Sequence, residues 1–201
     1  MDHAPEDVMF SASVKQQQEQ RGSRGQYAAK ATRGLRTAIS EDLLLFLAQR
    51  DSFYLGTVSG DGQPYIQHRG GPKGFIKVLG ERRIGFADLE GNRQYITLGN
   101  LADNPRAFIF LMDYANQQRL KLWGRARVIE DDAALIAQLA EDVSYAKTPK
   151  RAIVFDIEVW DINCRQHITP RFTEEQLRPG IEKLQARIVE LEAENEKLRA
   201  N

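Results

Sequence analysis

Cysteine and histidine are scarce in this chain of 201 residues, which has one cysteine, Cys164, and three histidines. A single thiol excludes a disulfide within the chain, as is typical of proteins in a reducing compartment. A structural zinc site needs three or four ligands. Cys164 and His167 are close in sequence, but only His3 and His68 could complete such a set. We therefore expect neither a disulfide nor a metal site.

Long apolar runs and an excess of either charge are also missing. No stretch approaches the roughly 20 apolar residues that span a bilayer, and the N-terminus lacks the basic and apolar regions of a secretory signal. Lys+Arg and Asp+Glu each number 28, so the formal net charge is zero, which argues against non-specific binding of nucleic acid. We therefore expect a cytoplasmic protein that binds neither membranes nor nucleic acid.

The charges are unevenly distributed along the chain. Basic residues outnumber acidic ones between Tyr65 and Arg127, and the order is reversed between Val128 and Asp161. A basic centre in a neutral protein is typical of a site for a small anion, although two solvated strand faces would look the same. No G-x-G-x-x-G motif follows a strand and opens a helix, so NAD binding on a Rossmann crossover is not supported.

Segments rich in β-forming residues fill most of the middle of the chain, and turn signals such as Gly60-Asp61-Gly62 separate them. In the last but one segment apolar and basic side chains alternate, and Gly124 is a candidate β-bulge. Six or more antiparallel strands with few helices between them indicate a barrel or sandwich. We predict a mainly β fold, a six-stranded antiparallel β-barrel with peripheral helices. Seven segments are candidates for these strands: residues 53–59, 64–70, 74–80, 83–88, 106–114, 119–130 and 152–162.

Helices are predicted at three places around this barrel. Ser40 is a candidate N-cap for a helix that runs through residues 43–50. A second helix is expected over residues 92–102, where Asp103-Asn104-Pro105 would stop it. A third is expected over residues 131–142.

Both ends of the chain are predicted to lie outside the barrel domain, which would span residues 36–170. Residues 1–35 are polar and have too few apolar side chains to offset their ordering entropy, so we expect a flexible or partly helical arm. In residues 171–201, Thr173 and Gln176 fit a capping box that opens a helix. Pro179-Gly180 is expected to kink or break that helix.

Beyond this break the apolar residues recur in steps of three and four, the spacing of a coiled coil. With Ile181 at heptad position a, isoleucine occupies a and leucine occupies d, which favours two parallel helices, and Asn195 at a sets register and dimer state. An amphipathic helix lying on its own barrel is the alternative, but it explains the leucines and not the asparagine together with the charges. We therefore predict a homodimer with a parallel coiled-coil tail. The charge pairs between positions g and e would be Arg187 with Glu192 and Glu194 with Arg199.

A strand-turn-helix segment carries the best candidate site. The strand ends at Ala87-Asp88, a turn with a glycine follows, and the predicted helix starts near Asn92. Helix N-termini present free N–H groups and a partial positive charge, which suit phosphate. Arg93 would add a charge-assisted grip, and Asn92 and Gln94 can donate neutral hydrogen bonds. The alternative is that Asn92 only caps the helix and Arg93 is solvated.

A second candidate lies on the strand over residues 64–70. Strand alternation puts His68 and Arg69 on opposite faces. We expect Arg69 to face a ligand and His68 to be structural. Gly71 and Gly74 would let the backbone approach that ligand closely.

Three stretches together resemble the FMN-binding split barrels of the pyridoxamine 5′-phosphate oxidase superfamily: GQPYIQHRGGPKGF, IGFADLEGNRQYITLGNLADNPRAFIF and RLKLWGRARV. The resemblance covers roughly residues 40–162 and is closest to a flavin-nucleotide-binding branch other than the vitamin-pathway oxidase. It implies an FMN-binding split barrel that dimerises with FMN at the subunit interface.

The resemblance also implies roles for single residues. Gln67 and Arg69 match the strand that lines the cofactor, and Arg93 matches a phosphate-binding arginine. Gln94 stands where the family usually has a second basic residue, and Arg119 where it often has a glutamine that contacts the flavin. Two further matches are the strand end that meets the flavin ring, with Phe86, Ala87 and Asp88, and a tryptophan that reaches the partner's cofactor, Trp160.

The chain departs from the oxidase after Trp160. The oxidase has a basic Arg–His–Arg-type run there, whereas this chain reads DINCRQHITPRF. The polar residues Asn163, Gln166 and His167 are candidates to line a site, but pyridoxal-type phosphates are not expected to bind.

The leading hypothesis is a flavin-dependent oxidoreductase in which FMN carries reducing equivalents for an unknown small substrate. No general acid or base is indicated. One alternative is a non-catalytic FMN-binding or sensing protein whose coiled coil recruits a partner. Another is a barrel that has lost flavin and binds a different anion, such as haem or a nucleotide.

Overall fold

Seven strands form one sheet in the computed structural model, which describes residues 4–141, 149–163 and 165–200. Their order is β2-β1-β5-β6-β7-β4-β3, so β2 and β3 are the two edges. β1 pairs with β2 and β5, β4 pairs with β3 and β7, and β6 pairs with β7, all antiparallel. The predicted mainly β fold is confirmed, with seven strands instead of six. The strands are β1 Ser52–Val58, β2 Pro64–Gly70, β3 Lys77–Gly80, β4 Arg83–Asp88, β5 Arg106–Asp113, β6 Gln118–Ile129 and β7 Arg151–Asn163.

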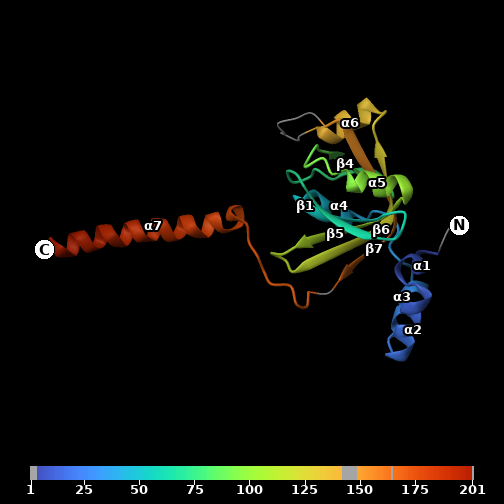
Figure 1. Ribbon diagram of the computed structural model, residues 1–201. Helices are drawn as coiled ribbons and strands as arrows, with labels where there is room; N and C mark the ends of the chain where they lie inside the picture. The colour runs from blue at the N-terminus through green and yellow to red at the C-terminus, as the bar shows by residue number, and fades with distance from the viewer. Residues whose placement is uncertain (1–3, 142–148, 164, 201) are drawn as a thin grey trace. The chain divides into compact units, whose positions relative to one another are not determined.

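The chain divides into two compact units. One consists of residues 1–113 and 119–164 and holds nearly all of the sheet, and the other consists of residues 114–118 and 165–201. Figure 1 shows the strands gathered in the first unit, from β1 in cyan to β7 in orange, with the N-terminal helices in blue.

Alternating apolar side chains of the strands build the core of the first unit. Leu55, Leu111, Leu120 and Phe155 are fully buried there, and burying each such side chain stabilises the fold by about 1.5–3 kcal/mol. In β6 the predicted alternation holds, since Leu120, Leu122 and Ala126 are buried while Arg125 and Arg127 are exposed.

The predicted bulge in β6 is confirmed, because the register with β7 shifts between Trp123 and Gly124. A Cβ on Gly124 would lie 2.1 Å from the carbonyl oxygen of Asp156. Only glycine therefore allows this close approach of two strands. The strand predicted over residues 74–80 begins later, at Lys77, because Gly74 has a left-handed φ of 80° and the N–H of Phe75 donates to Pro72 in a turn.

Helix α4, Glu41–Ala48, begins as predicted, with the Ser40 hydroxyl accepting from the N–H of Leu43 at 3.3 Å. Helix α6, Ala133–Ala140, begins two residues later than predicted, because Asp132 caps it and accepts from Leu135. The predicted end of the helix before Pro105 is confirmed in α5, Ile96–Asp103.

The predicted start of α5 at Asn92 is wrong. Arg93 and Tyr95 have left-handed φ angles of 63° and 54°, which a right-handed helix does not allow. The carboxamide oxygen of Asn92 instead accepts from the N–H of Gln94 at 3.2 Å, a local turn that competes with helix formation. Residues 92–94 therefore form a loop before the helix.

The N-terminal arm contains three short helices, α1 Pro5–Met9, α2 Ala12–Gln20 and α3 Arg24–Thr32. These helices bury little apolar surface, and an ion pair joins the first to the third: Arg24 of α3 lies 2.7 Å from Glu6 of α1. The ring of Phe10 adds an edge contact with Tyr27 at 5.3 Å. Lys30 of α3 also lies 2.6 Å from Asp161 of β7.

The second unit contains the long helix α7, Glu174–Arg199. The predicted capping box is confirmed: Thr173 accepts from the N–H of Gln176, and its own N–H donates to the Gln176 side chain. Of the kink or break predicted at Pro179-Gly180, the break is wrong, because the helix continues through Pro179, and the kink stays a prediction. A proline removes one backbone hydrogen bond, which the capped first turns and the long C-terminal part outweigh. Among the described residues, no helix is both long and apolar enough to cross a bilayer.

Candidate functional site

A buried carboxylate between two arginines marks the candidate site. Asp88, at the end of β4, accepts from Nη1 of Arg69 at 2.5 Å and from Nε of Arg151 at 3.0 Å. The Asp88 side chain is only 3% exposed. The β4–β7 register sets Asp88 directly opposite Arg151. Arg69 comes from β2, the far edge of the sheet, so this ion pair joins two ends of the sheet that are remote in strand order.

The cluster carries an excess of positive charge. Arg69 and Arg151 share one buried carboxylate. Glu130, 3.9 Å from Arg151, is 65% exposed and therefore offsets this charge only weakly. Burial alone would lower the pKa of Arg151, but the hydrogen bond and charge of Asp88 outweigh it and hold that pKa above its usual value. Arg151 therefore stays charged beside Asp88 at neutral pH.

One hydrogen-bond donor in this cluster lacks an acceptor within the described part of the chain. The Nε of Arg69 is buried and has no hydrogen-bond partner among the described residues. Leaving a buried donor unpaired costs about 1–3 kcal/mol, so such groups in folded proteins are functional candidates. An acceptor that entered here would satisfy this group.

A small pocket of about 40 Å³ opens at the cluster, between β2, the end of β4, residues 89–95 and the start of α5. Gln67 of β2 accepts from the hydroxyl of Thr97 at 2.7 Å and so ties the strand to α5. The first turn of α5 has no side-chain cap, and its residues 96–98 line the pocket. The predicted site residues that line it are Gln67, Arg69, Asp88, Asn92, Arg93 and Gln94.

Arg93 lies at the mouth of this pocket. Its side chain is 67% exposed and forms an ion pair with Glu90, three residues earlier, at 3.3 Å. An exposed pair of this kind holds the side chain weakly, by about 0–1 kcal/mol. Arg93 is therefore free to turn toward a bound anion at little cost.

Three other predicted residues lie elsewhere in the first unit. Phe86 is in the core, in an edge contact with Phe53 at 4.9 Å, and Ala87 packs against the small cluster beneath α6. Trp160 is 3% exposed, and its indole N–H donates to the carbonyl of Ala38 at 2.8 Å. Since an indole has one donor, Trp160 makes its polar contact within its own chain.

The remaining predicted residues are not gathered at the pocket. Arg119 is half-buried in β6 and is paired in register with Asn163 of β7; the side chain of Asn163 lies outside the described part. Gln166 and His167 belong to the second unit, where both are exposed. Cys164 lies outside the described residues.

Sequence reasoning missed three residues that the pocket brings together: Tyr95, Thr97 and Arg151. The guanidinium of Arg151 lies over the ring of Tyr95 at 5.4 Å, a cation–π contact. The only sequence signal for Arg151 is its place at the start of a strand, and that signal becomes informative only when the strand register is known.

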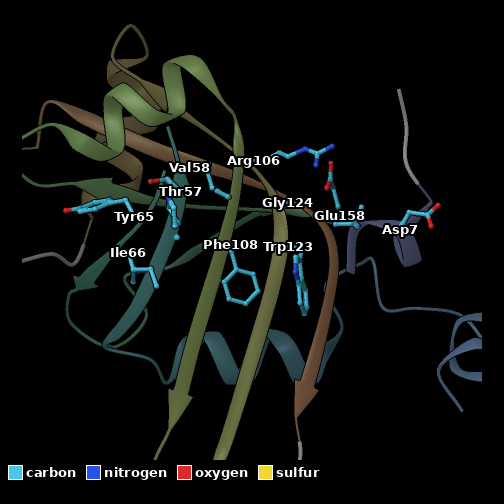
Figure 2. Close-up of a pocket in the computed structure, with 14 residues that line it drawn as sticks. Asp7, Thr57, Val58, Tyr65, Ile66, Arg106, Phe108, Trp123, Gly124 and Glu158 are labelled. Carbon is cyan, nitrogen blue, oxygen red and sulfur yellow. The ribbon is translucent and has the colours of Figure 1, made fainter. Parts of the chain in front are cut away.

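A larger, mainly apolar groove of about 420 Å³ lies beside the pocket. Tyr65 of β2 lines both. In Figure 2, Phe108 and Trp123 lie side by side in the middle of the groove, with Tyr65 and Ile66 at one end and Arg106, Glu158 and Asp7 at the other. The ring centroids of Phe108 and Trp123 are 5.0 Å apart. Ile66 is 69% exposed, which is unusual for an isoleucine beside a groove of this size.

The part of the sequence that forms the sheet matches one known protein family. The sequence model of the family described as pyridoxamine 5′-phosphate oxidase matches residues 39–164. No curated protein matches the chain.

Solved structures with a similar fold cover 62–63% of this chain. A single-residue variant of HupZ from Group A Streptococcus is 17% identical, with a TM-score of 0.50 over 62% of this chain and 99% of that one. An FMN-binding protein from Syntrophomonas wolfei is 15% identical, with a TM-score of 0.46 over 62% of this chain and 88% of that one. The FAD binding protein from Mycobacterium smegmatis is 17% identical, with a TM-score of 0.43 over 63% and 96%. At a sequence identity of 17%, the similarity to the HupZ variant indicates a shared fold and nothing about function.

Proposed function

The chain belongs to the pyridoxamine 5′-phosphate oxidase family, as its sequence resemblance predicted, and on this premise we propose that it binds FMN and acts as a flavin-dependent oxidoreductase on a small substrate. The observation that carries the proposal is the buried Nε of Arg69, which has no partner in the described part of the chain, in a pocket lined by three arginines and one aspartate. The absence of disulfide and membrane signals in the sequence supports a cytoplasmic setting.

The residues of the pocket fit a phosphoryl group. Arg69 offers a free donor, Arg93 an exposed guanidinium, and the uncapped start of α5 a set of backbone N–H groups. Helix starts and arginines are the usual partners of phosphate oxygens in proteins. Asp88 holds the Arg69 side chain through Nη1 and leaves Nε for a ligand.

The pocket is too small for a whole flavin nucleotide. Ligand sites for molecules of that size measure about 300–1,000 Å³, whereas this pocket measures about 40 Å³ and the adjoining groove about 420 Å³. We therefore place the phosphoryl end in the pocket and the ring beyond it, where pocket and groove meet at Tyr65. The flavin supplies the reversible uptake of electrons, and the chain's residues bind and orient it.

A second copy of the barrel would cover the groove and complete the flavin site. The support is the mainly apolar lining of the groove together with Ile66, which is 69% exposed at its edge, because faces of this kind are typical of subunit interfaces. Ile66→Glu should then lower flavin retention without unfolding the barrel, because residue 66 points away from the core.

The first test is the flavin itself. The protein purified from cells should carry the visible absorption band of oxidised flavin or take up added FMN, and a colourless protein that binds no FMN would refute the proposal. Steady oxidation of reduced nicotinamide with an electron acceptor would support an oxidoreductase. Bound flavin without turnover would instead support the non-catalytic alternative.

The second test is the phosphate grip. Arg93→Ala should weaken FMN binding by about 10- to 100-fold, the loss of one or two charge-assisted hydrogen bonds worth about 1.5–3 kcal/mol. Fluorescence titration in phosphate-free buffer measures this. The matched control is Arg125→Ala, another exposed and ion-paired arginine, which lies outside the pocket and should leave affinity unchanged.

A further inference from the structure

Helix α7 carries a stripe of apolar side chains that its own unit leaves uncovered. None of its 26 residues, all of them described, is buried. Single exposed apolar residues are common on protein surfaces, but here they lie along one side of a helix. Six leucine and isoleucine side chains are 41–69% exposed: Leu177, Ile181, Leu184, Ile188, Leu191 and Leu198.

The unbroken helix makes this stripe longer than the sequence alone indicates. Because α7 continues through Pro179, the heptad frame that sets Ile181 at position a extends back to Leu177 at d. Pro179 falls at f, on the side opposite the stripe. From Leu177 to Leu198 the stripe runs 21 residues, or about 32 Å along the helix axis. That length is three heptads, with leucine at every d position.

We propose that the occupant of this stripe is the α7 helix of a second copy of the chain, in parallel and in register. Isoleucine at a with leucine at d favours two helices over three or four. Asn195, the one polar residue in the stripe, would meet Asn195 of the partner subunit and share a hydrogen bond with it. An asparagine at a is known to select a parallel, two-stranded register in this way.

The charges beside the stripe select the same arrangement. In the parallel pair Arg187 at g faces Glu192 of the partner subunit at e, and Glu194 faces Arg199 of the partner subunit. The antiparallel pair would bring Arg187 against Glu194 of the partner subunit, but Arg178 against Arg199 of the partner subunit would offset this attraction. It would also bury Asn195 against a leucine. Like charges repel, and a buried amide without a partner is costly.

The ion pairs that α7 already makes are easily exchanged. Arg187 lies 2.9 Å from Glu190 on the same helix, with both side chains more than 60% exposed. Exposed pairs contribute about 0–1 kcal/mol, so Arg187 can turn to the partner helix. This tail contact holds two copies together whether or not the barrels carry a ligand.

A cysteine cross-link in the full chain tests the orientation. In a Cys164→Ser background, Leu198→Cys should give a covalent dimer on mild oxidation, because residue 198 meets its own copy only in a parallel pair. Val189→Cys is the control, since residue 189 is also apolar and 65% exposed but lies at position b, off the stripe. Cross-linking of both variants alike, or of neither, would overturn the proposal.

Two neighbouring substitutions test the stripe itself. Ile188→Glu at a should slow the 198–198 cross-link at least 10-fold, and Val189→Glu at b should leave the rate unchanged. Both residues are β-branched and exposed, so only their heptad position differs. Equal effects of the two substitutions would refute the heptad assignment. Flavin content, measured on the same samples, should be the same in both, so this result is independent of the proposed function.

Discussion

The buried Asp88 offers a quantitative test of the site, because the chain contains its exposed counterpart. Asp88 is held by Arg69 at 2.5 Å and Arg151 at 3.0 Å. Asp156 is held by Arg83 at 2.5 Å and by Arg127 at 3.0 Å, the same geometry on the surface. The Asp88 side chain is 3% exposed and that of Asp156 is 38% exposed. Burial is therefore the main difference between the two clusters.

We expect Asp88→Asn to lower the free energy of unfolding by about 3 kcal/mol, the lower end of the range for breaking a buried ion pair. The lower end applies because the asparagine oxygen can still accept one hydrogen bond. Asp156→Asn should cost less than about 1 kcal/mol, as for exposed pairs. Urea unfolding followed by circular dichroism measures both.

Phosphate gives the same experiment a second readout. Asp88→Asn leaves two guanidinium groups without their carboxylate, so inorganic phosphate should stabilise this variant more than it stabilises the wild type. Stabilisation by a ligand follows RT ln(1 + [L]/Kd), about 2.7 kcal/mol at 100 times Kd. A loss below about 1 kcal/mol, or a phosphate effect equal in the two proteins, would refute the account of a positively charged pocket organised by Asp88.

Three further predictions concern the bulge in β6 and helix α7. Gly124→Ala should destabilise the barrel by about 3 kcal/mol, measured by urea unfolding, because its Cβ would meet the carbonyl of Asp156; a loss below that of Asp156→Asn would contradict the close approach. Thr173→Ala should reduce the helical signal and cost about 0.5–2 kcal/mol by removing the cap of α7, and an unchanged spectrum would mean that the capping box is not formed. Asn195→Val should shift the protein toward higher oligomers in sedimentation experiments, whereas a strict dimer would show that Asn195 does not select the oligomeric state.

Local signals predicted the parts of this fold that depend on a few neighbouring residues. Ser40 and Thr173 cap their helices because a hydroxyl at that position reaches a free N–H within one turn. Gly124 forms the bulge because no other residue fits there. Strand alternation placed Arg69 on the inward side of β2 and His68 outside.

The parts that failed depend on contacts between distant segments or on rare backbone angles. Arg151 meets Asp88, 63 residues away, only through the β4–β7 register, which no local pattern encodes. The late start of α5 follows from left-handed angles at Arg93 and Tyr95, which these residue types seldom adopt. The residue type of Pro179 predicts a kink or a break, but the helix continues through this position and the rest of α7 is intact.

The pocket and the closure of the sheet share one residue. In the strand order β2 and β4 are separated by four strands, yet Arg69 of β2 reaches Asp88 of β4. Arg69 thus holds two remote parts of the sheet together through Nη1 and leaves Nε for an acceptor in the pocket. An anion that binds Nε would add a contact to the same side chain that joins the strands, because a guanidinium is rigid and planar. Anion binding at Nε and the ion pair between β2 and β4 would therefore be coupled through the one side chain of Arg69.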